Sequence, residues 1–272
     1  TLGTSGGVRC HRFVLGTGML TALARSPVVL QFRCFGTFTL IGENDWSAKP
    51  ARARGRELLQ YLVAHPNGFA SREVLAEAFW PELSIDEVGN RLHLAASGAR
   101  ASLRDALDDV DPIRCVEGAY GWHASVAIVS DVTRFTACYN DGSPAAMREA
   151  IAIYGGELFA NDRAEWIVPL RVRYTSAYLT MLERLARHAL SNDDHAGSLD
   201  YGLQLRAEDP GHESAARLVM HCFAKLGRRH SAIAEYDSLC RHLRRGLNVK
   251  PTAETEALRR AILSGDHEGG AR

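Results

Sequence analysis

The sequence predicts a mixed fold, in which an α+β winged helix-turn-helix domain is followed by an all-α domain of TPR-like helical repeats. Residues 28–125 combine strand-like alternation, capped amphipathic helices and a two-strand ribbon. After Asp131 the alternation gives way to helical periodicity that continues to about Leu263. The 272-residue chain also exceeds the usual size of one domain, so we expect a boundary near Ser130 and a second domain at 131–264.

The first elements are predicted strands. Apolar and polar residues alternate from residue 28, and the apolar positions are Leu30, Phe32 and Cys34. Gly36 separates this run from a second one at residues 38–41. We therefore expect a small antiparallel sheet ahead of the helices.

Two helices follow, joined by a turn at His65–Gly68. The first begins with the basic residues Arg52, Arg54 and Arg56. Its apolar stripe follows, formed by Leu58, Leu59, Leu62 and Val63. The second is expected to begin at the N-cap residue Ser71, because a hydroxyl can accept from the free N–H groups of the first turn. Pro81 ends it, and its predicted buried stripe is Val74, Leu75, Ala78 and Phe79.

Ser84 and Glu87 have capping-box spacing, so a third helix is predicted from Ile85 to about Leu107. Its apolar stripe is Leu92, Ala96, Ala99, Leu103 and Leu107. The opposite side is polar and partly basic, and it carries Asn90, Ser97 and Ala101, flanked by Arg91, His93, Arg100 and Arg104. Such a face suits the major groove of DNA.

A two-strand ribbon is predicted next. Pro112 precedes a strand at Ile113–Val116, a turn at Glu117-Gly118 and a second strand from Tyr120 to His123. Three helices followed by such a ribbon are typical of a winged helix that binds DNA.

The second half contains a weak repeat. Residues 198–201 align with residues 233–236 at an offset of 35, close to the period of tetratricopeptide hairpins. Pro210 and Pro251 separate the two units. Stacked helical pairs are usually scaffolds that bind partner proteins.

Charge and composition restrict the function. Residues 28–125 contain ten basic and thirteen acidic residues, so DNA binding must depend on a local basic face.

The six cysteines lack metal-ligand spacing and are expected to be ordinary buried thiols of a cytoplasmic protein. A secretory signal in residues 9–24 is the less favoured interpretation. We expect residues 1–27 to be a linker or extension and residues 265–272 a flexible tail.

No nucleophile, phosphate loop or metal motif supports catalysis. His212-Glu213 begins like a zinc-protease HExxH motif, but Ala216 occupies the position of the second histidine. Trp122 and Trp166 lie beside apolar residues and are expected to be core anchors. We therefore expect a protein that is not an enzyme and has no cofactor.

The chain resembles the Streptomyces antibiotic regulatory protein family, in which an OmpR-like winged helix precedes a bacterial transcriptional activation domain. The motifs that carry the resemblance are Arg56–Leu62, Phe79–Glu82, Asn90–His93, Tyr154–Leu158, Glu165-Trp166, Asp209-Pro210 and Leu247–Pro251 with Thr255. The resemblance covers roughly residues 28–263. It implies a cytoplasmic regulator that binds promoter repeats on double-stranded DNA as a homo-oligomer and recruits RNA polymerase, with no cofactor and no membrane association.

The predicted DNA contacts fall into two groups. Phosphate contacts are assigned to Arg52, Arg54, Arg72 and the ribbon. Base contacts are assigned to Asn90, Arg91, Ser97 and Arg100, with His93 and Arg104 beside them. The alternative for the arginines is a solvated helix face, and for His93 a structural role.

A competing hypothesis is a protein-interaction scaffold, or the output segment of a larger signalling protein, whose DNA-binding domain is weakened. Three features motivate it. The family usually has a basic residue and a leucine where this chain has Gly98 and Ala99, and an arginine is common where Glu117 stands. The excess of acidic residues in 28–125 is the third.

Overall fold

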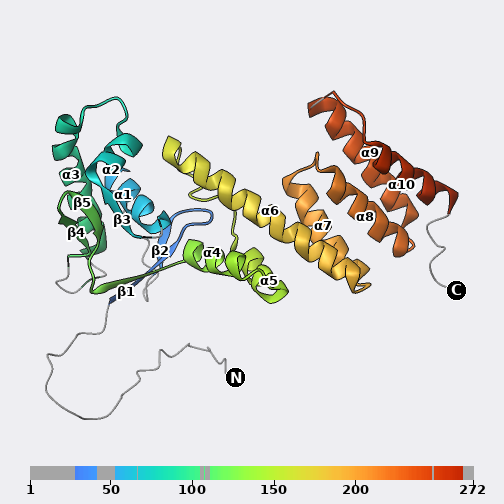
Figure 1. Ribbon diagram of the computed structural model, residues 1–272, viewed down its shortest axis with the longest axis horizontal. Helices are drawn as coiled ribbons and strands as arrows, with labels where there is room; N and C mark the ends of the chain where they lie inside the picture. The colour runs from blue at the N-terminus through green and yellow to red at the C-terminus, as the bar shows by residue number, and fades with distance from the viewer. Residues whose placement is uncertain are drawn as a thin grey trace, which may run out of the picture.

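A computed structural model describes residues 28–41, 53–65, 67–104, 107, 111–246 and 248–265. The fold is mixed α+β, as predicted. Small sheets and three helices form one end of the molecule, and the long helix α6 (Val168–Ser191) leads from there to a stack of helices at the other end (Figure 1).

The first sheet has the strand order β2-β1-β6. Strands β1 (Val28–Arg33) and β2 (Thr39–Ile41) pair antiparallel, as the sequence indicated. Strand β6 (Val126–Ser130) pairs with β1 in parallel, a strand and a pairing that were not predicted from the sequence. The predicted alternation in β1 is confirmed, because Leu30 and Phe32 are buried and Gln31 is exposed.

Three helices and a second sheet, of strand order β3-β5-β4, complete this end of the molecule. The elements are α1 (Ala53–Ala64), β3 (Phe69–Ser71), α2 (Arg72–Phe79), α3 (Ile85–Leu103), β4 (Ile113–Val116) and β5 (Ala119–Trp122). Helix α1 packs closely on α3 at Gly55, where an added Cβ would lie 2.7 Å from the backbone nitrogen of Ala99. A larger residue at Gly55 would therefore push the two helices apart.

The predicted helix starts are confirmed and two details are corrected. Ser71 Oγ accepts from the backbone N–H of Val74 at 3.3 Å, and the backbone N–H of Ser84 donates to Glu87 at 3.0 Å. Val74 is exposed, however, and Ala76 takes its place in the buried stripe of α2. Helix α3 ends at Leu103 instead of Leu107, although Leu107 is still buried.

The remaining elements are helical. They are α4 (Asp131–Asp141), α5 (Pro144–Ile153), the 3-10 turn η2 (Glu165–Ile167), α6, α7 (His195–Glu208), α8 (Glu213–Lys225), α9 (Arg229–Gly246) and α10 (Ala253–Ser264). Each helix from α6 to α9 packs on the next, and α10 packs on α8 and α9. Pro210 and Pro251 lie between helices, as expected.

One hydrophobic core joins the two parts of the chain. The Asp131 carboxylate, at the start of α4, accepts from the backbone N–H groups of Cys34 and Phe35 at 2.8 to 3.0 Å. The Phe35 ring lies 5.0 Å from the ring of Phe135 and 5.6 Å from that of Tyr174. The chain changes character near Ser130, but the packing is continuous across that point.

The burial of the cysteines and tryptophans agrees only in part with what the sequence predicted. Among the described cysteines, Cys34, Cys138 and Cys222 are buried, whereas Cys115 is exposed on β4, contrary to the expectation of ordinary buried thiols. Cys10 lies outside the described residues. Trp122 is buried, and the half-buried Trp166 donates from Nε1 to Glu57 at 3.1 Å.

Candidate nucleic-acid interface

The outward face of α3 is the most prominent polar surface that the sequence singled out. Its exposed residues are Asn90, Arg91, His93, Leu94, Ser97, Ala101 and Arg104. The opposite face, which includes Leu92, Ala96 and Ala99, is fully buried. Helical periodicity therefore divided this helix correctly between core and solvent.

Leu94 is the residue of this face that sequence reasoning missed. It lies about 40° from Asn90 on a helical wheel of ~100° per residue, yet it is 53% exposed. An apolar residue type gives no sign of an exposed position, and only the spacing of Leu94 from Asn90 and Ser97 could have placed it on the outer face. An exposed apolar side chain among polar neighbours can contact the methyl group of a thymine.

The first turn of α3 is acidic. Glu87 accepts both from the backbone N–H of Ser84, at 3.0 Å, and from the Ser84 hydroxyl, at 2.6 Å. These hydrogen bonds lower the pKa of Glu87. Asp86 adds a second exposed carboxylate in the same turn. Carboxylates stabilise a helix N-terminus but repel a phosphate backbone.

Two of the arginines assigned to phosphate are engaged within the protein. Arg54 donates to Glu57 at 2.6 Å and lies 5.1 Å from the ring centre of Trp80. Arg72 donates to the backbone carbonyl of Ile85 at 2.6 Å, which links the start of α2 to the start of α3. Arg52 lies outside the described residues.

Arg100 joins α3 to the β4–β5 hairpin. Its Nε donates to Asp111 at 2.8 Å, and its Nη2 donates to the carbonyl of Ile113 at 2.7 Å. The guanidinium thus faces the base of the hairpin, to the side of the outward face. This geometry makes Arg100 a residue that positions the hairpin.

The hairpin itself turns at Glu117 and Gly118, which have φ angles of 51° and 81°. Both residues are in the left-handed region, as a two-residue type I′ turn requires, and glutamate adopts it at a cost. The Arg114 guanidinium lies 4.8 Å from the ring centre of Phe69. That ring occupies the space beside Gly121, where an added Cβ would lie 2.1 Å from it. Arg114 is therefore an exposed cation held in place, although it was not among the predicted DNA contacts.

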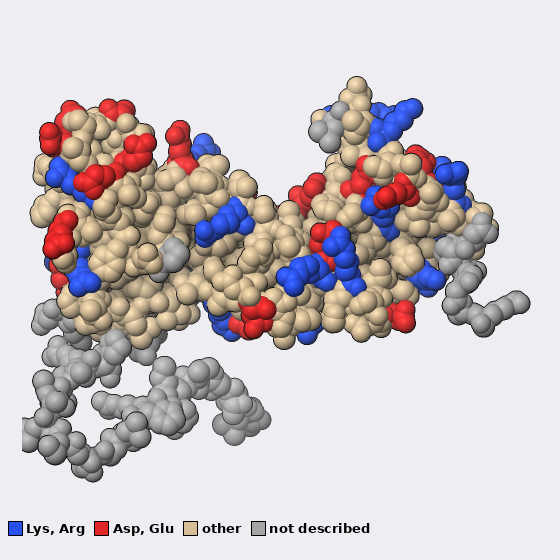
Figure 2. Space-filling view, in the orientation of Figure 1, with Lys and Arg blue, Asp and Glu red and all other residues tan. Residues whose placement is uncertain are grey.

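The surface charge around these elements is mixed. Five acidic side chains of α2, α3 and the loop between them are exposed, namely Glu73, Glu77, Glu82, Asp86 and Glu87. Figure 2 shows acidic side chains gathered over the end of the molecule that carries α1 to α3, with fewer basic ones on that face. Among the described residues of α1 to α3 and the hairpin, the exposed cations are Arg54, Arg91, Arg104 and Arg114, and Arg54 is paired with Glu57.

Other classes of site find no support in the part of the chain that the structure describes. No group of histidine, cysteine and carboxylate side chains there could hold a metal ion. No helix among those residues is long and apolar enough to span a membrane.

Comparisons with known proteins find a family match in the helical part. Residues 130–263 match the model of the bacterial transcriptional activator domain. The solved structure of Mycobacterium tuberculosis EmbR in complex with a low-affinity phosphopeptide has a similar fold, with a TM-score of 0.67 at 18% identity. The match covers 87% of this chain and 65% of the EmbR chain, so the chain spans about two thirds of that structure's length. No curated protein matches the chain.

Proposed function

Because the chain belongs, through residues 130–263, to the bacterial transcriptional activator domain family, we propose that it is a DNA-binding transcriptional activator. The sequence motifs indicated the Streptomyces antibiotic regulatory proteins, and that assignment is confirmed, since this domain is the second of the two that define the family. The chain acts by binding, without catalysis or a cofactor, and works in the cytoplasm.

The DNA-binding part is a winged helix in which α3 enters the major groove and the β4–β5 hairpin is the wing. The observation that carries this assignment is the polar outward face of α3, with the hairpin held beside it by Arg100. A recognition helix needs one face packed on its own domain and one face free for base edges. Helix α3 meets both conditions.

The residues divide into three roles. Base edges are read by Asn90, Arg91 and Ser97, with Leu94 against thymine methyl groups and His93 at the margin. Phosphates are bound by Arg104 and Arg114. Arg54, Arg72 and Arg100 position these elements through their contacts inside the protein.

The helical part supplies the partner surface. In this proposal the helix pairs α7–α8 and α9–α10 are the two TPR-like units, and each pair contains one of the aligned segments, 198–201 and 233–236. Stacked pairs of this kind present broad surfaces to other proteins. The proposed partners are RNA polymerase and a second copy of the chain. A second copy is expected because tandem promoter repeats bind two linked copies more tightly than one.

Gel-shift titration against the chain's own upstream region tests the proposal. Arg91→Ala should weaken specific binding by ~1–3 kcal/mol and relax base preference at one position. The matched control is Arg187→Ala, which removes an exposed arginine of α6 that pairs with Glu183. Equal operator affinity in Arg91→Ala, Arg187→Ala and the unchanged chain would rule out base reading by α3.

One observation favours a second function. The acidic residues around α2 and the first turn of α3, together with the internal contacts of Arg72 and Arg100, leave few cations for DNA. A protein-interaction scaffold does not need exposed cations that bind DNA. The two functions separate at low salt, where a DNA-binding domain binds nonspecific duplex and a scaffold does not.

A further inference from the structure

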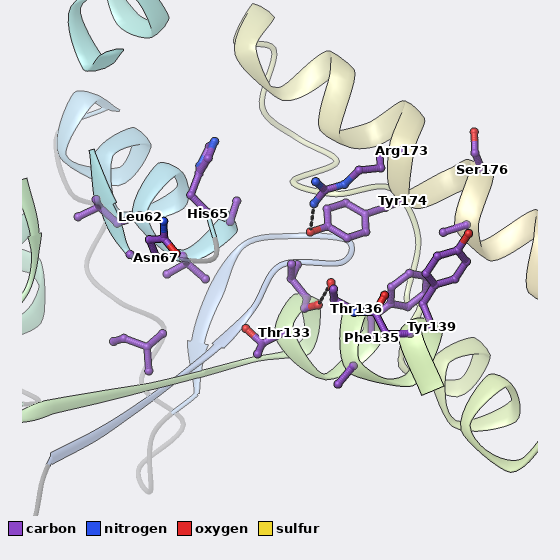
Figure 3. Close-up of a pocket in the computed structure, with 18 of the residues that line it drawn as sticks. Leu62, His65, Asn67, Thr133, Phe135, Thr136, Tyr139, Arg173, Tyr174 and Ser176 are labelled. Carbon is purple, nitrogen blue, oxygen red and sulfur yellow. Dashed lines mark hydrogen bonds between the residues drawn. The ribbon is translucent and has the colours of Figure 1, made fainter. Parts of the chain in front are cut away.

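A cavity of about 920 Å³ lies between the two parts of the molecule. Its walls come from the end of α1, from Trp122 of β5 and Ile128 of β6, and from α4 and α6. Figure 3 shows the lining side chains of these elements around one space. The volume is within the range of small-molecule sites, and such sites are common where two structural units meet.

The lining has an apolar body and no negative charge. Leu62, Val63, Ile128, Val132 and Phe135 supply apolar walls. None of the twenty described lining residues is an aspartate or a glutamate. The indole N–H of Trp122 is buried without a hydrogen-bond partner among the described residues, but it is closed off from the cavity. The chemistry of these walls fits a largely apolar molecule.

Arg173 gives the cavity a positive charge. Its guanidinium donates to the Tyr174 hydroxyl at 2.6 Å and lies 4.6 Å from the centre of that ring. Among the described residues it forms no ion pair with a carboxylate. A cation at the edge of an apolar space, with no carboxylate to neutralise it, attracts an anion.

His65 lies on the other side of the same space from Arg173 (Figure 3). Burial lowers the pKa of His65, the hydrogen bond with the Tyr61 carbonyl opposes that shift, and the Arg173 charge adds to it. The histidine ring stacks on Tyr61, with ring centres 3.9 Å apart. Arg173 is therefore the permanent cation of the cavity, and His65 adds a flat surface.

We propose that this cavity is a binding site for a small aromatic molecule that carries one acidic group. The aromatic body lies between the apolar side chains of α1 and α4, and the acidic group lies against Arg173. Nothing in the proposed DNA contacts uses these residues, so the site is separate from the α3 face. A ligand there touches both parts of the molecule and stabilises the arrangement in which they meet.

Calorimetric titration of the full chain with 2-naphthoate tests the site, with 2-naphthalenemethanol as the neutral molecule of the same shape. We expect one naphthoate per chain and at least tenfold weaker binding of the alcohol, because a charge-assisted hydrogen bond contributes about 1.5 kcal/mol or more. Arg173→Gln should weaken naphthoate by about tenfold and leave the alcohol unchanged. The control Arg187→Gln, on the same helix, should bind both as the unchanged chain does.

Blocking variants locate the site independently of charge. Ala177→Phe on α6 and Thr133→Phe on α4 each place a ring into the cavity from a different wall. Both should abolish naphthoate binding, and Thr133 is exposed, so its replacement should leave folding intact. Equal affinity for the acid and the alcohol, absence of saturable binding, or unchanged binding in a folded Thr133→Phe variant would overturn the proposal.

Discussion

Arginines of the same helix have two different roles in this structure. Arg91 is exposed on the outward face of α3, whereas Arg100 is only 27% exposed at its side chain and donates to Asp111 and to the Ile113 carbonyl. The sequence placed both on the polar side, because periodicity assigns a face to each residue. It could not identify the partners of Arg100, since Asp111 and Ile113 approach only after the chain folds back.

Substituting Arg100 tests this division of roles. Arg100→Ala removes charge-assisted hydrogen bonds to the hairpin, so it should lower the free energy of unfolding by about 1–3 kcal/mol. Arg91→Ala should change that free energy by less than about 0.5 kcal/mol, because Arg91 is exposed. Urea denaturation measures both. If Arg100→Ala unfolds at the same urea concentration as the unchanged chain, Arg100 does not hold the hairpin. Its predicted role as a base contact would then stand again.

Glu117 is the other residue whose effect can be isolated. It lies at the tip of the proposed wing with φ at 51°, and its carboxylate would repel a phosphate brought close to that tip. Glu117→Arg should strengthen DNA binding at low salt and steepen the slope of log affinity against log salt by about 1. Glu117→Asn is the matched variant, since it removes the charge, suits the turn and adds no cation. Identical salt slopes for the Glu117→Arg and Glu117→Asn variants would mean that the wing tip does not approach the phosphates.

At the scale of elements, helix starts were predictable and helix ends were less so. Ser71, Ser84 and Glu87 lie next to the N–H groups that they cap, so local spacing is enough to find them. Helix α3 ends four residues earlier than its apolar stripe suggested, because Leu107 reaches the core from outside the helix. Strand β6 was missed because its partner β1 is about a hundred residues away in the chain.

Glu213 connects two of the C-terminal helices and gives a prediction at this scale. At the start of α8, it accepts from the backbone N–H and hydroxyl of Thr252, at 2.9 and 2.8 Å, and from the Thr255 hydroxyl at 2.8 Å. Burial raises the pKa of Glu213, but these hydrogen bonds and Arg217 outweigh it, so the pKa lies below its ordinary value of 4.5. The carboxylate form therefore stabilises the start of α10.

Glu213→Gln should lower the free energy of unfolding by about 1 kcal/mol at pH 7, since part of the interaction is screened by solvent. The folded chain binds fewer protons at this site than the unfolded chain. The stabilisation is therefore complete above pH ~4.5 and is lost as the pH falls through the lower pKa of the folded state. Thermal melts from pH 7 to pH 3 should show the difference between the two proteins shrinking. A constant difference across that range would contradict the carboxylate's role.

At the scale of the whole molecule, the packing is continuous across Ser130, where strand β6 gives way to helix α4. The Phe159 ring lies 5.3 Å from that of Phe38, and the Trp166 ring lies 5.0 Å from that of Tyr61. The backbone N–H of Phe159 also donates to the carbonyl of Cys34 at 2.9 Å. A sequence shows which side chains are apolar, but it does not show which of two neighbouring units will cover them. Residues 131–191 complete the core of the part formed by residues 28–130.

Truncation after Ser130 should therefore destabilise the part that remains. It would expose Phe35, Phe38 and Tyr61, which are 2%, 6% and 8% exposed in the full chain, and would remove the Asp131 carboxylate from Cys34 and Phe35. Each large apolar side chain contributes ~1.5–3 kcal/mol when buried, so three of them approach the ~5–15 kcal/mol that stabilises a typical domain. We expect the fragment to lose its near-UV circular dichroism and to unfold without a cooperative transition. Removing only residues 265–272 is the matched control and should leave both properties unchanged. Cooperative unfolding of the 1–130 fragment with a native near-UV spectrum would show that this part folds by itself and that the shared core is dispensable.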